Sequence, residues 1–263
     1  MKKLALLIGI LFVFAPKPTH AASELEIWCL AESETWDSVT STCYINVRHG
    51  PALKISSPLT VLEGETISNN DYIGNEDTIN NNGTIINSSN YGYIFNDGTI
   101  NNNGTIINDG ILINDGVVNN YGIINNYGTF TNRDIINNYD AITNNENGTI
   151  ISAGSIRTGH TTFNNYGTII SAGSISIGYF TTFNNNGTIT NNENGTITNG
   201  DHGTINNDGI ITNNENGTIY NSSIINNDGT ITNNGAIIRC FNSKSHFKAI
   251  IYFCPAYLPL IKG

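Results

Sequence analysis

A six-residue spacing of glycine runs through the middle of the chain and limits what it can fold into. Between Asn96 and Asp140 a glycine recurs at every sixth position until Asp134 and Asp140 take its place, and an apolar residue follows two positions later. These glycines are Gly98, Gly104, Gly110, Gly116, Gly122 and Gly128. The spacing does not fit a helical turn of about 3.6 residues, and Gly and Asn are poor helix formers. The pattern predicts one short strand and one bend per unit, as in an all-β, single-chain β-solenoid of hexapeptide-type repeats.

The expected unit is Gly-Thr-Ile-x-Asn-Asn. We expect Ile to face inward, Thr and x to face outward, and Asn-Asn-Gly to bend, because Asn and Gly tolerate positive φ. Strands stacked about 4.8 Å apart would align Ile into columns and Asn into amide ladders. Three units per coil would give a triangular prism of nine or ten coils, about 45 Å long. The repeat resembles the left-handed hexapeptide β-helix, but the residue after Ile departs from that family's pattern, so the handedness and the number of residues per coil stay open.

Composition divides the chain into four segments. Residues 1–22 are predicted to be a secretory signal peptide, with two Lys ahead of an apolar stretch too short to span a bilayer. Residues 23–64 are predicted to be an N-terminal cap, residues 65–238 the β-solenoid, and residues 239–263 a C-terminal cap. The alternatives are an uncleaved anchor for the first segment, a carbohydrate-binding patch on Trp28 and Trp36 for the second, and membrane or wall attachment for the last.

Departures from the hexad are themselves patterned. Two extra residues, Glu-Asn, precede Gly in the units that begin at Asn144, Asn191 and Asn213. An insertion of two keeps the in-and-out alternation of a strand, so we expect it to bulge at a corner. Residues 148–187 contain two longer copies of one segment, which place Phe163 and Phe183 where Ile would otherwise point inward.

The four cysteines flank the repeat as two equally spaced pairs, Cys29 with Cys43 and Cys240 with Cys254. In a chain with an export signal, an even number of Cys outside the repeat predicts two local disulfides. Tighter Cys or His spacing of the C-x2-C kind, which a zinc site would need, is not present.

The charge balance limits the partners. Formal net charge is -10, and residues 65–238 hold two Arg and no Lys. Nucleic acid and anionic membranes both require clustered basic residues, so neither is expected as a partner, and membrane attachment is not expected. A disordered polar tract is the alternative for such an Asn-rich segment, but disorder gives no reason for the regular Ile.

No catalytic motif or cofactor-binding motif emerges from the repeat. His160 and His202 are the only His within it, without the Lys that a coenzyme A site would need, and we expect both to be exposed loop residues. The Asp residues replace Gly or Asn at bends, and no nucleophile elbow, HExxH, P-loop or calcium nonapeptide occurs. We therefore expect a non-catalytic protein without metal or cofactor, with a polysaccharide-acting β-helix enzyme as the alternative from another class.

Two further patterns bear on function. Thr precedes the inward residue in many units, so stacked coils would form outward Thr columns, which makes an ice-binding or carbohydrate-binding solenoid an alternative. Paired Thr-x-Thr ranks, such as Thr188-Ile189-Thr190 and Thr196-Ile197-Thr198, are rare. Possible glycosylation sequons occur at Asn82, Asn87, Asn103, Asn147, Asn186, Asn194, Asn216 and Asn221.

The segment TWDSVTSTCYI (Thr35–Ile45), followed by NNGTI repeats, resembles a group of secreted Asn/Gly-rich repeat proteins of archaea and bacteria. The resemblance covers about Thr35 to Ile238. It implies an exported β-solenoid at the cell surface without a defined activity. We expect a secreted, structural or adhesin-like repeat protein whose partner is a surface polysaccharide, a surface protein or another copy of itself.

Overall fold

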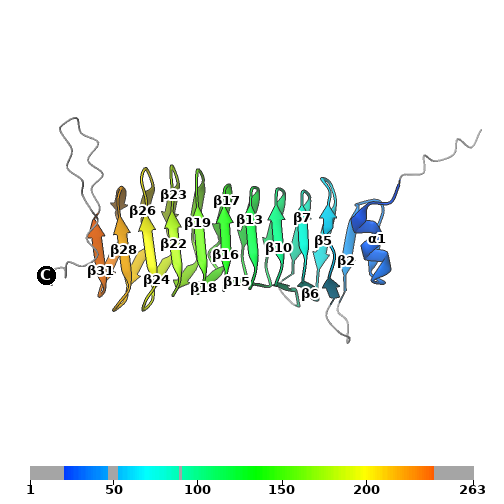
Figure 1. The fold of residues 1–263 in the computed structure, drawn as a ribbon, viewed down its shortest axis with the longest axis horizontal. Helices are drawn as coiled ribbons and strands as arrows, with labels where there is room; N and C mark the ends of the chain where they lie inside the picture. The colour runs from blue at the N-terminus through cyan, green and yellow to red at the C-terminus, as the bar shows by residue number, and fades with distance from the viewer. Residues whose placement is uncertain (1–20, 47–52, 89–90, 240–263) are drawn as a thin grey trace, which may run out of the picture.

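The structure is a computed structural model that describes residues 21–46, 53–88 and 91–239. Its described part is a β-solenoid of stacked coils, with the short helix α1 (Glu24–Ala31) at one end (Figure 1). Each full coil contributes one strand to each of three sheets, so strands three apart in the chain lie side by side. The predicted all-β solenoid is confirmed, and sheets of ten strands at about 4.8 Å spacing give the expected length of about 45 Å.

The eleven-stranded sheet, here sheet A, is parallel except for its first pair. Its strands in spatial order are β1 (Thr35–Asp37), β2 (Thr42–Ile45), β5 (Thr66–Asn69), β8 (Thr84–Asn87), β11 (Thr105–Asn108), β14 (Ile123–Asn126), β17 (Ala141–Asn144), β20 (Thr162–Asn165), β23 (Thr182–Asn185), β26 (Thr204–Asn207) and β29 (Ile224–Asn227).

The other two sheets have ten strands each. Sheet B contains β3 (Leu53–Ile55), β6 (Tyr72–Asn75), β9 (Tyr93–Asn96), β12 (Ile111–Asn114), β15 (Thr129–Asn132), β18 (Thr149–Ser152), β21 (Thr168–Ser171), β24 (Thr188–Asn191), β27 (Ile210–Asn213) and β30 (Thr230–Asn233). Sheet C contains β4 (Leu59–Val61), β7 (Thr78–Asn81), β10 (Thr99–Asn102), β13 (Val117–Asn120), β16 (Ile135–Asn138), β19 (Ser155–Thr158), β22 (Ser174–Ile177), β25 (Thr196–Asn199), β28 (Thr218–Asn221) and β31 (Ala236–Arg239).

The aliphatic column of each sheet forms the core. The second residue of each four-residue strand faces inward, and equivalent residues stack in register, as Ile100 does between Ile79 and Val118. Phe163 stacks on Phe183 with ring centroids 4.7 Å apart, as the two longer copies predicted. Each buried Ile contributes about 1.5–3 kcal/mol, so hydrophobic burial along the rod is the main stabilising term.

The asparagine that ends most strands has a different position from the one that we expected. We expected it to belong to the bend, but it is the last strand residue, faces inward and is completely buried, as Asn126 is. The Nδ2 of Asn126 donates to Asn144 Oδ1 at 2.8 Å, and its Oδ1 accepts from Asn108 Nδ2 at 2.7 Å. The same Nδ2 also donates to the Gly128 carbonyl at 3.1 Å. The amide ladders are therefore inside the prism, at its corners, where most of the Asn–Asn hydrogen bonds are buried.

The repeated glycines are required by close packing rather than by positive φ. Among the described glycines only Gly64 has positive φ, at 83°. A Cβ on Gly116 would lie 2.1 Å from the Gly98 carbonyl oxygen of the coil below. Where Asp134 takes the glycine position, the bond from the next amide, Ile135 N, to the Gly116 carbonyl is 3.2 Å, against 2.9 Å for Val117 N to Gly98. The missing side chain therefore lets consecutive coils approach closely at the corner.

The two-residue insertions bulge at corners, as predicted. Asn144 and Ile150 on either side of the first insertion both remain buried, so the alternation is kept. Asn194 and Asn216, in the other two insertions, have positive φ of 62°. The insertions therefore change the length of a coil without disturbing its strands.

The N-terminal segment closes one end of the rod. The Ser23 side chain caps α1 by accepting a hydrogen bond from Glu26 N at 3.1 Å, and Leu25 and Cys29 are completely buried against the first coil. The predicted bridge between Cys29 and Cys43 is present, with the Cα atoms 5.8 Å apart. Trp28 and Trp36 pack against the core and are partly buried.

The first coil lies within the segment that we assigned to the cap. β2, β3 and β4 pair in parallel with β5, β6 and β7, so coil stacking starts at Thr42 rather than at residue 65. These strands lack the Gly-Thr-Ile-x-Asn signature, which is why the repeat did not reveal them. Cys240, Cys254 and the predicted C-terminal cap lie outside the described residues, except Arg239.

Candidate functional site

Charge is confined to the corners of the prism along most of the rod. From Asp71 to Asp228 every Asp and Glu lies between two strands. In that range the described strands carry one charged residue, Arg157 of β19 on sheet C. In this range the faces of sheets A and B carry no charge and that of sheet C carries only Arg157, and the three faces differ in the residues that point outward.

The outward side chains of sheet B are hydroxyl-bearing or apolar over most of its length. From β9 to β30 they are Tyr93, Phe95, Ile111, Ile113, Thr129, Thr131, Thr149, Ile151, Thr168, Ile170, Thr188, Thr190, Ile210, Thr212, Thr230 and Thr232. We call this set the hydroxyl–aliphatic face. Its side chains stack in register, so Thr149, Thr168 and Thr188 form one column. The expected outward Thr columns are thus present on this sheet, where they are joined by isoleucine.

One tyrosine pair at the N-terminal end of sheet B is also stacked. The Tyr72 and Tyr93 ring centroids are 4.8 Å apart, with 12° between the ring planes. Burial raises the pKa of Tyr72, with a smaller contribution from Tyr93, so its phenol stays neutral beyond its ordinary range. Lys54, the one charge on the strands of sheet B, lies below this pair and is paired with Glu76.

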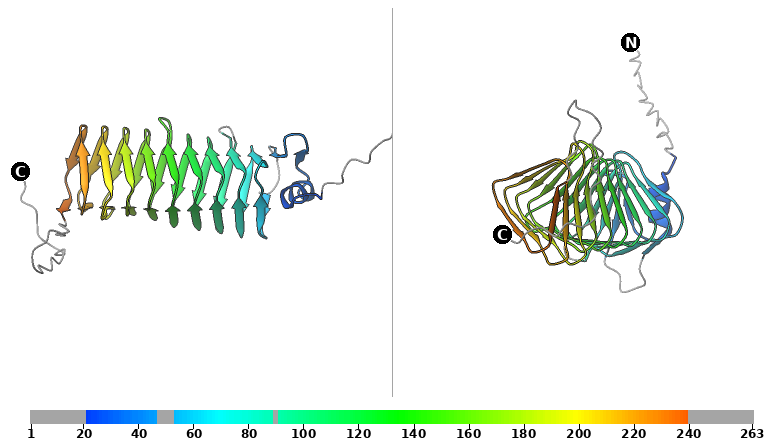
Figure 2. Two further views of the ribbon diagram at one scale, coloured as in Figure 1. Left: turned by 90° about the horizontal axis from the view of Figure 1, so that it is seen from above. Right: turned by 60° about the vertical axis from the view of Figure 1, so that its left-hand side comes forward.

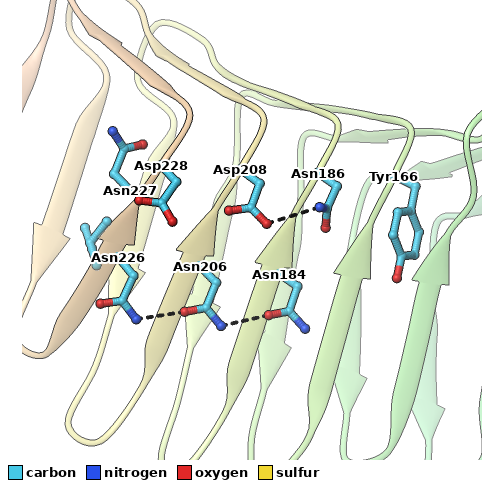
Figure 3. Close-up of a pocket in the computed structure, with 9 residues that line it drawn as sticks. Tyr166, Asn184, Asn186, Asn206, Asp208, Asn226, Asn227 and Asp228 are labelled. Atoms are coloured by element: carbon cyan, nitrogen blue, oxygen red, sulfur yellow. Dashed lines mark hydrogen bonds between the residues drawn. The ribbon is translucent and has the colours of Figure 1, made fainter.

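An open groove of about 790 Å³ lies on sheet A and its corner with sheet B, toward the C-terminal end (Figure 3). Along its floor the outward amides form a ladder, in which Asn226 donates to Asn206 and Asn206 to Asn184, each at 2.9 Å. Asn186 donates to Asp208 at 3.3 Å on the corner. The groove presents amides, the carboxylates of Asp208 and Asp228 and the phenol of Tyr166, so it offers both hydrogen-bond donors and acceptors.

The corner between sheets C and A carries a line of aromatic side chains on consecutive coils. They are Tyr121, Tyr139, His160, Tyr179, Phe180 and His202, and all are exposed. We call this line the aromatic corner. Tyr121 and Tyr139 stack with centroids 4.9 Å apart, and Phe180 and His202 stack at the same separation with 13° between their planes. His160 lies 5.7 Å from Phe180 and 6.2 Å from Tyr179, which joins the group across three coils.

Sequence reasoning placed His160 and His202 correctly in exposed loops but did not bring them together with the tyrosines. Each lies in an insertion of its own length, so their common corner follows only from the stacking of the coils. Within the described part of the chain, no group of three or more His, Cys, Asp and Glu is arranged to hold a metal ion.

The predicted sequons divide into two groups. Asn82, Asn103, Asn147, Asn186, Asn194 and Asn216 are exposed at corners. Asn87 is completely buried and Asn221 is half-buried, and both accept amide hydrogen bonds within the internal ladders. The fold therefore presents only the first group to a modifying enzyme.

None of the described helices has the length and apolar character needed to cross a membrane. Comparison with known proteins gives no match, because no protein-family model fits the chain and no curated protein or solved structure is similar to it.

Proposed function

We propose that this protein is an exported, non-catalytic structural rod that acts at the cell surface, as a spacer or an adhesin. The observation that carries the proposal is an interior of stacked aliphatic columns and hydrogen-bonded amide ladders, enclosed by three long faces on which Arg157 is the one charge between Asp71 and Asp228. A stack of coils can hold two partners at a fixed distance, and it presents the same contact repeatedly along its length.

The oxidised cysteine pair supports export. Cys29 and Cys43 are joined in the segment that closes the rod, and structural disulfides persist mainly in oxidising compartments. The signal-like residues 1–22 and the resemblance to secreted repeat proteins point the same way. The expected partners are a surface polysaccharide, a surface protein or another copy of the chain.

Two experiments on intact cells test the location. An antibody against the protein should label unpermeabilised cells, and protease added outside the cells should release the protein together with other envelope proteins. Deletion of the gene should reduce attachment or change the spacing of the envelope layers without removing an enzymatic activity. Recovery of the protein, with reduced Cys29 and Cys43, only in the soluble interior of the cell would contradict the proposal.

A second candidate function, ice binding, gains from one observation. The hydroxyl–aliphatic face collects Thr129-x-Thr131, Thr188-x-Thr190 and Thr230-x-Thr232 on one sheet, although these pairs are far apart in sequence. A regular, uncharged array of hydroxyl and methyl groups is the chemistry that could order water. Thr168→Lys on this face should abolish inhibition of ice recrystallisation, whereas Thr105→Lys on sheet A should not, and inactivity of the unaltered protein removes this candidate.

The exposed sequons complete the proposal. In a host that glycosylates exported proteins, Asn103 and the other corner sequons would carry glycans, and Asn87 would not, because its amide is buried. Intact-mass measurement followed by peptide mapping of native protein checks both parts, and an unmodified mass rejects the use of these sites.

A further inference from the structure

The aromatic corner is exposed to a degree that packing alone does not require. Tyr121 is 52% exposed, Tyr179 49% and Phe180 59%. Stacking between neighbouring rings stabilises the coils, but it uses only one face of each terminal ring and leaves edges and outer faces in water. Large exposed aromatic clusters on a folded protein usually mark a binding surface.

Backbone strain at the same corner supports this interpretation. His160, Phe180 and His202 have φ of 57°, 52° and 59°, a left-handed conformation that Phe rarely adopts and that His tolerates better. The other described residues with positive φ, apart from Gly64, are small and polar: Ser33, Ser41, Asn194 and Asn216. Phe180 therefore occupies a position where Asn or Gly would be less strained, which supports a binding role for its ring.

The surroundings of the corner define the class of ligand. Asp140 and Asp201 are the acidic residues on this corner beside the rings, and Arg157 is the nearest cation in the sequence. An acidic corner repels phosphate, which argues against nucleic acid and anionic lipid. The corner offers apolar ring surface together with phenol and imidazole groups that form hydrogen bonds. A neutral ligand with apolar C–H faces and many hydroxyl groups matches this combination.

Sheet C supplies further hydrogen-bonding groups next to Tyr121 and Tyr139. Its outward amides form a ladder in which Asn137 donates to Asn119 at 2.9 Å and Asn119 to Asn101 at 3.0 Å. Each amide keeps unused hydrogen-bonding capacity toward solvent. Rings and amides both repeat at the coil spacing of about 4.8 Å, so a linear ligand would lie along the rod.

We propose that the aromatic corner binds a neutral glycan chain, whose C–H groups contact the exposed outer edges of Tyr121, Tyr139, Tyr179 and Phe180 while hydroxyl groups bond to His160, His202 and the sheet C amides. This proposal deepens the surface role proposed above and rests on it. It names the polysaccharide among the three expected partners.

Affinity electrophoresis of the purified, oxidised protein tests the proposal with three uncharged, soluble polysaccharides: a glucan, a mannan and a galactan. We expect at least one to retard migration, and calorimetry with its hexasaccharide to give the affinity. Phe180→Gly should weaken binding at least ten-fold while the melting temperature stays unchanged or rises, since Gly suits the positive φ. A purely structural ring would show the opposite pattern, with lower stability and unchanged binding.

The matched control is the double variant Tyr127→Ser Tyr166→Ser, which removes two exposed tyrosines from the corner between sheets A and B. It should bind like the unaltered protein. Absence of retardation by all three polysaccharides, equal weakening by the control, or a dimer in solution that Phe180→Gly dissociates would each overturn the glycan assignment. If envelope association persists in cells expressing Phe180→Gly, the surface role stands and only the glycan site fails.

Discussion

At the scale of single residues, the buried asparagine is the feature that most distinguishes this solenoid. Its position was predicted only in part, because Asn is equally suited to a bend and to a ladder, and periodicity alone does not separate the two roles. The inward Ile was predictable because an alternating strand has only one side for it. The buried Asn became identifiable only when the strand was seen to extend one residue further.

Removing one ladder amide should destabilise the rod strongly. Asn126→Ala leaves Asn144 Oδ1 without its donor and Asn108 Nδ2 without its side-chain acceptor, both in a buried site. We expect a loss of about 2–4 kcal/mol in the free energy of unfolding. The control is Asn125→Ala, whose side chain points outward from the same strand and should stay within about 0.5 kcal/mol. An equal loss of unfolding free energy for the two variants in denaturant titrations would show that the ladder contributes nothing beyond the difference in strand propensity between Asn and Ala.

The corner glycines give a second test at this scale. Gly116→Ala forces a Cβ to within 2.1 Å of a backbone oxygen, so the coils must separate locally, at a cost of about 1–3 kcal/mol. Gly159→Ala places its Cβ where no atom lies within 4 Å, and it should leave stability unchanged or slightly improved. Thermal melts of the two variants distinguish two reasons for glycine at these positions, close packing of the coils and backbone freedom. A similar fall in melting temperature for both variants would favour backbone freedom.

At the scale of elements, the internal ladders are interrupted in the longer copies. Ser152 and Ser171 replace Asn in sheet B, and Ser171 Oγ and Asn191 Oδ1 are both buried without a hydrogen-bond partner. Ser171→Asn would supply a donor to Asn191 Oδ1 and should stabilise the protein by about 1 kcal/mol. Ser176→Asn, on the outer face of sheet C, is the control and should change little. A destabilised Ser171→Asn protein would mean that the corner there is too narrow for an amide.

Helix α1 is the element that the repeat gave no reason to expect. A signal was available, because Ser23 followed by Glu26 is a capping-box sequence, and the Ser23 side chain does cap the helix. The alternating apolar residues of CYI and LKI within 42–61 are typical of short strands, but they do not show that these strands belong to the first coil. Coil membership depends on the pairing of β2 with β5, which has no counterpart in local sequence.

The closed end of the rod should depend on the disulfide. The Cys29–Cys43 bridge closes a loop with a sequence separation of 14, for which the chain-entropy model gives about 3 kcal/mol. Cys29→Ala Cys43→Ala should lower the melting temperature and loosen α1, which exposes the first strands to pairing with other chains. We therefore expect sedimentation to show concentration-dependent association of the variant but not of the oxidised protein. A variant that melts at a lower temperature yet stays monomeric would show that the disulfide stabilises the fold but is not needed to prevent association at this end of the rod.

At the scale of the whole molecule, the aromatic corner illustrates what a linear sequence conceals. Successive coils place Tyr121, Tyr139, His160, Tyr179 and His202 on one line, although they are 18, 21, 19 and 23 residues apart. Insertions at different corners make the spacing irregular, so the line appears only when each coil length is known. Figure 2 shows the same regular stack from two further directions, with coils of different lengths kept in one row.

The strongest test of the architecture is to remove one coil. Thr105 pairs with Ile123, so residues 105–122 form one coil of 18 residues between equivalent positions. Their deletion joins Gly104 to β14 and should leave every ladder continuous, because β14 then stacks on β8 as β11 did. We expect a folded rod about 4.8 Å shorter, measurable by small-angle scattering, with a modest loss of stability from one missing coil.

The control deletion differs from the first by a single residue. Removal of residues 105–121 would leave Gly122 in addition, shift β14 by one position and turn Ile124 outward and Asn125 inward. We expect this variant to aggregate or to lose cooperative melting. If both deletions fold equally well, the chain tolerates a break in its inward alternation, and stacking of individual coils rather than continuous columns would have to account for the rod.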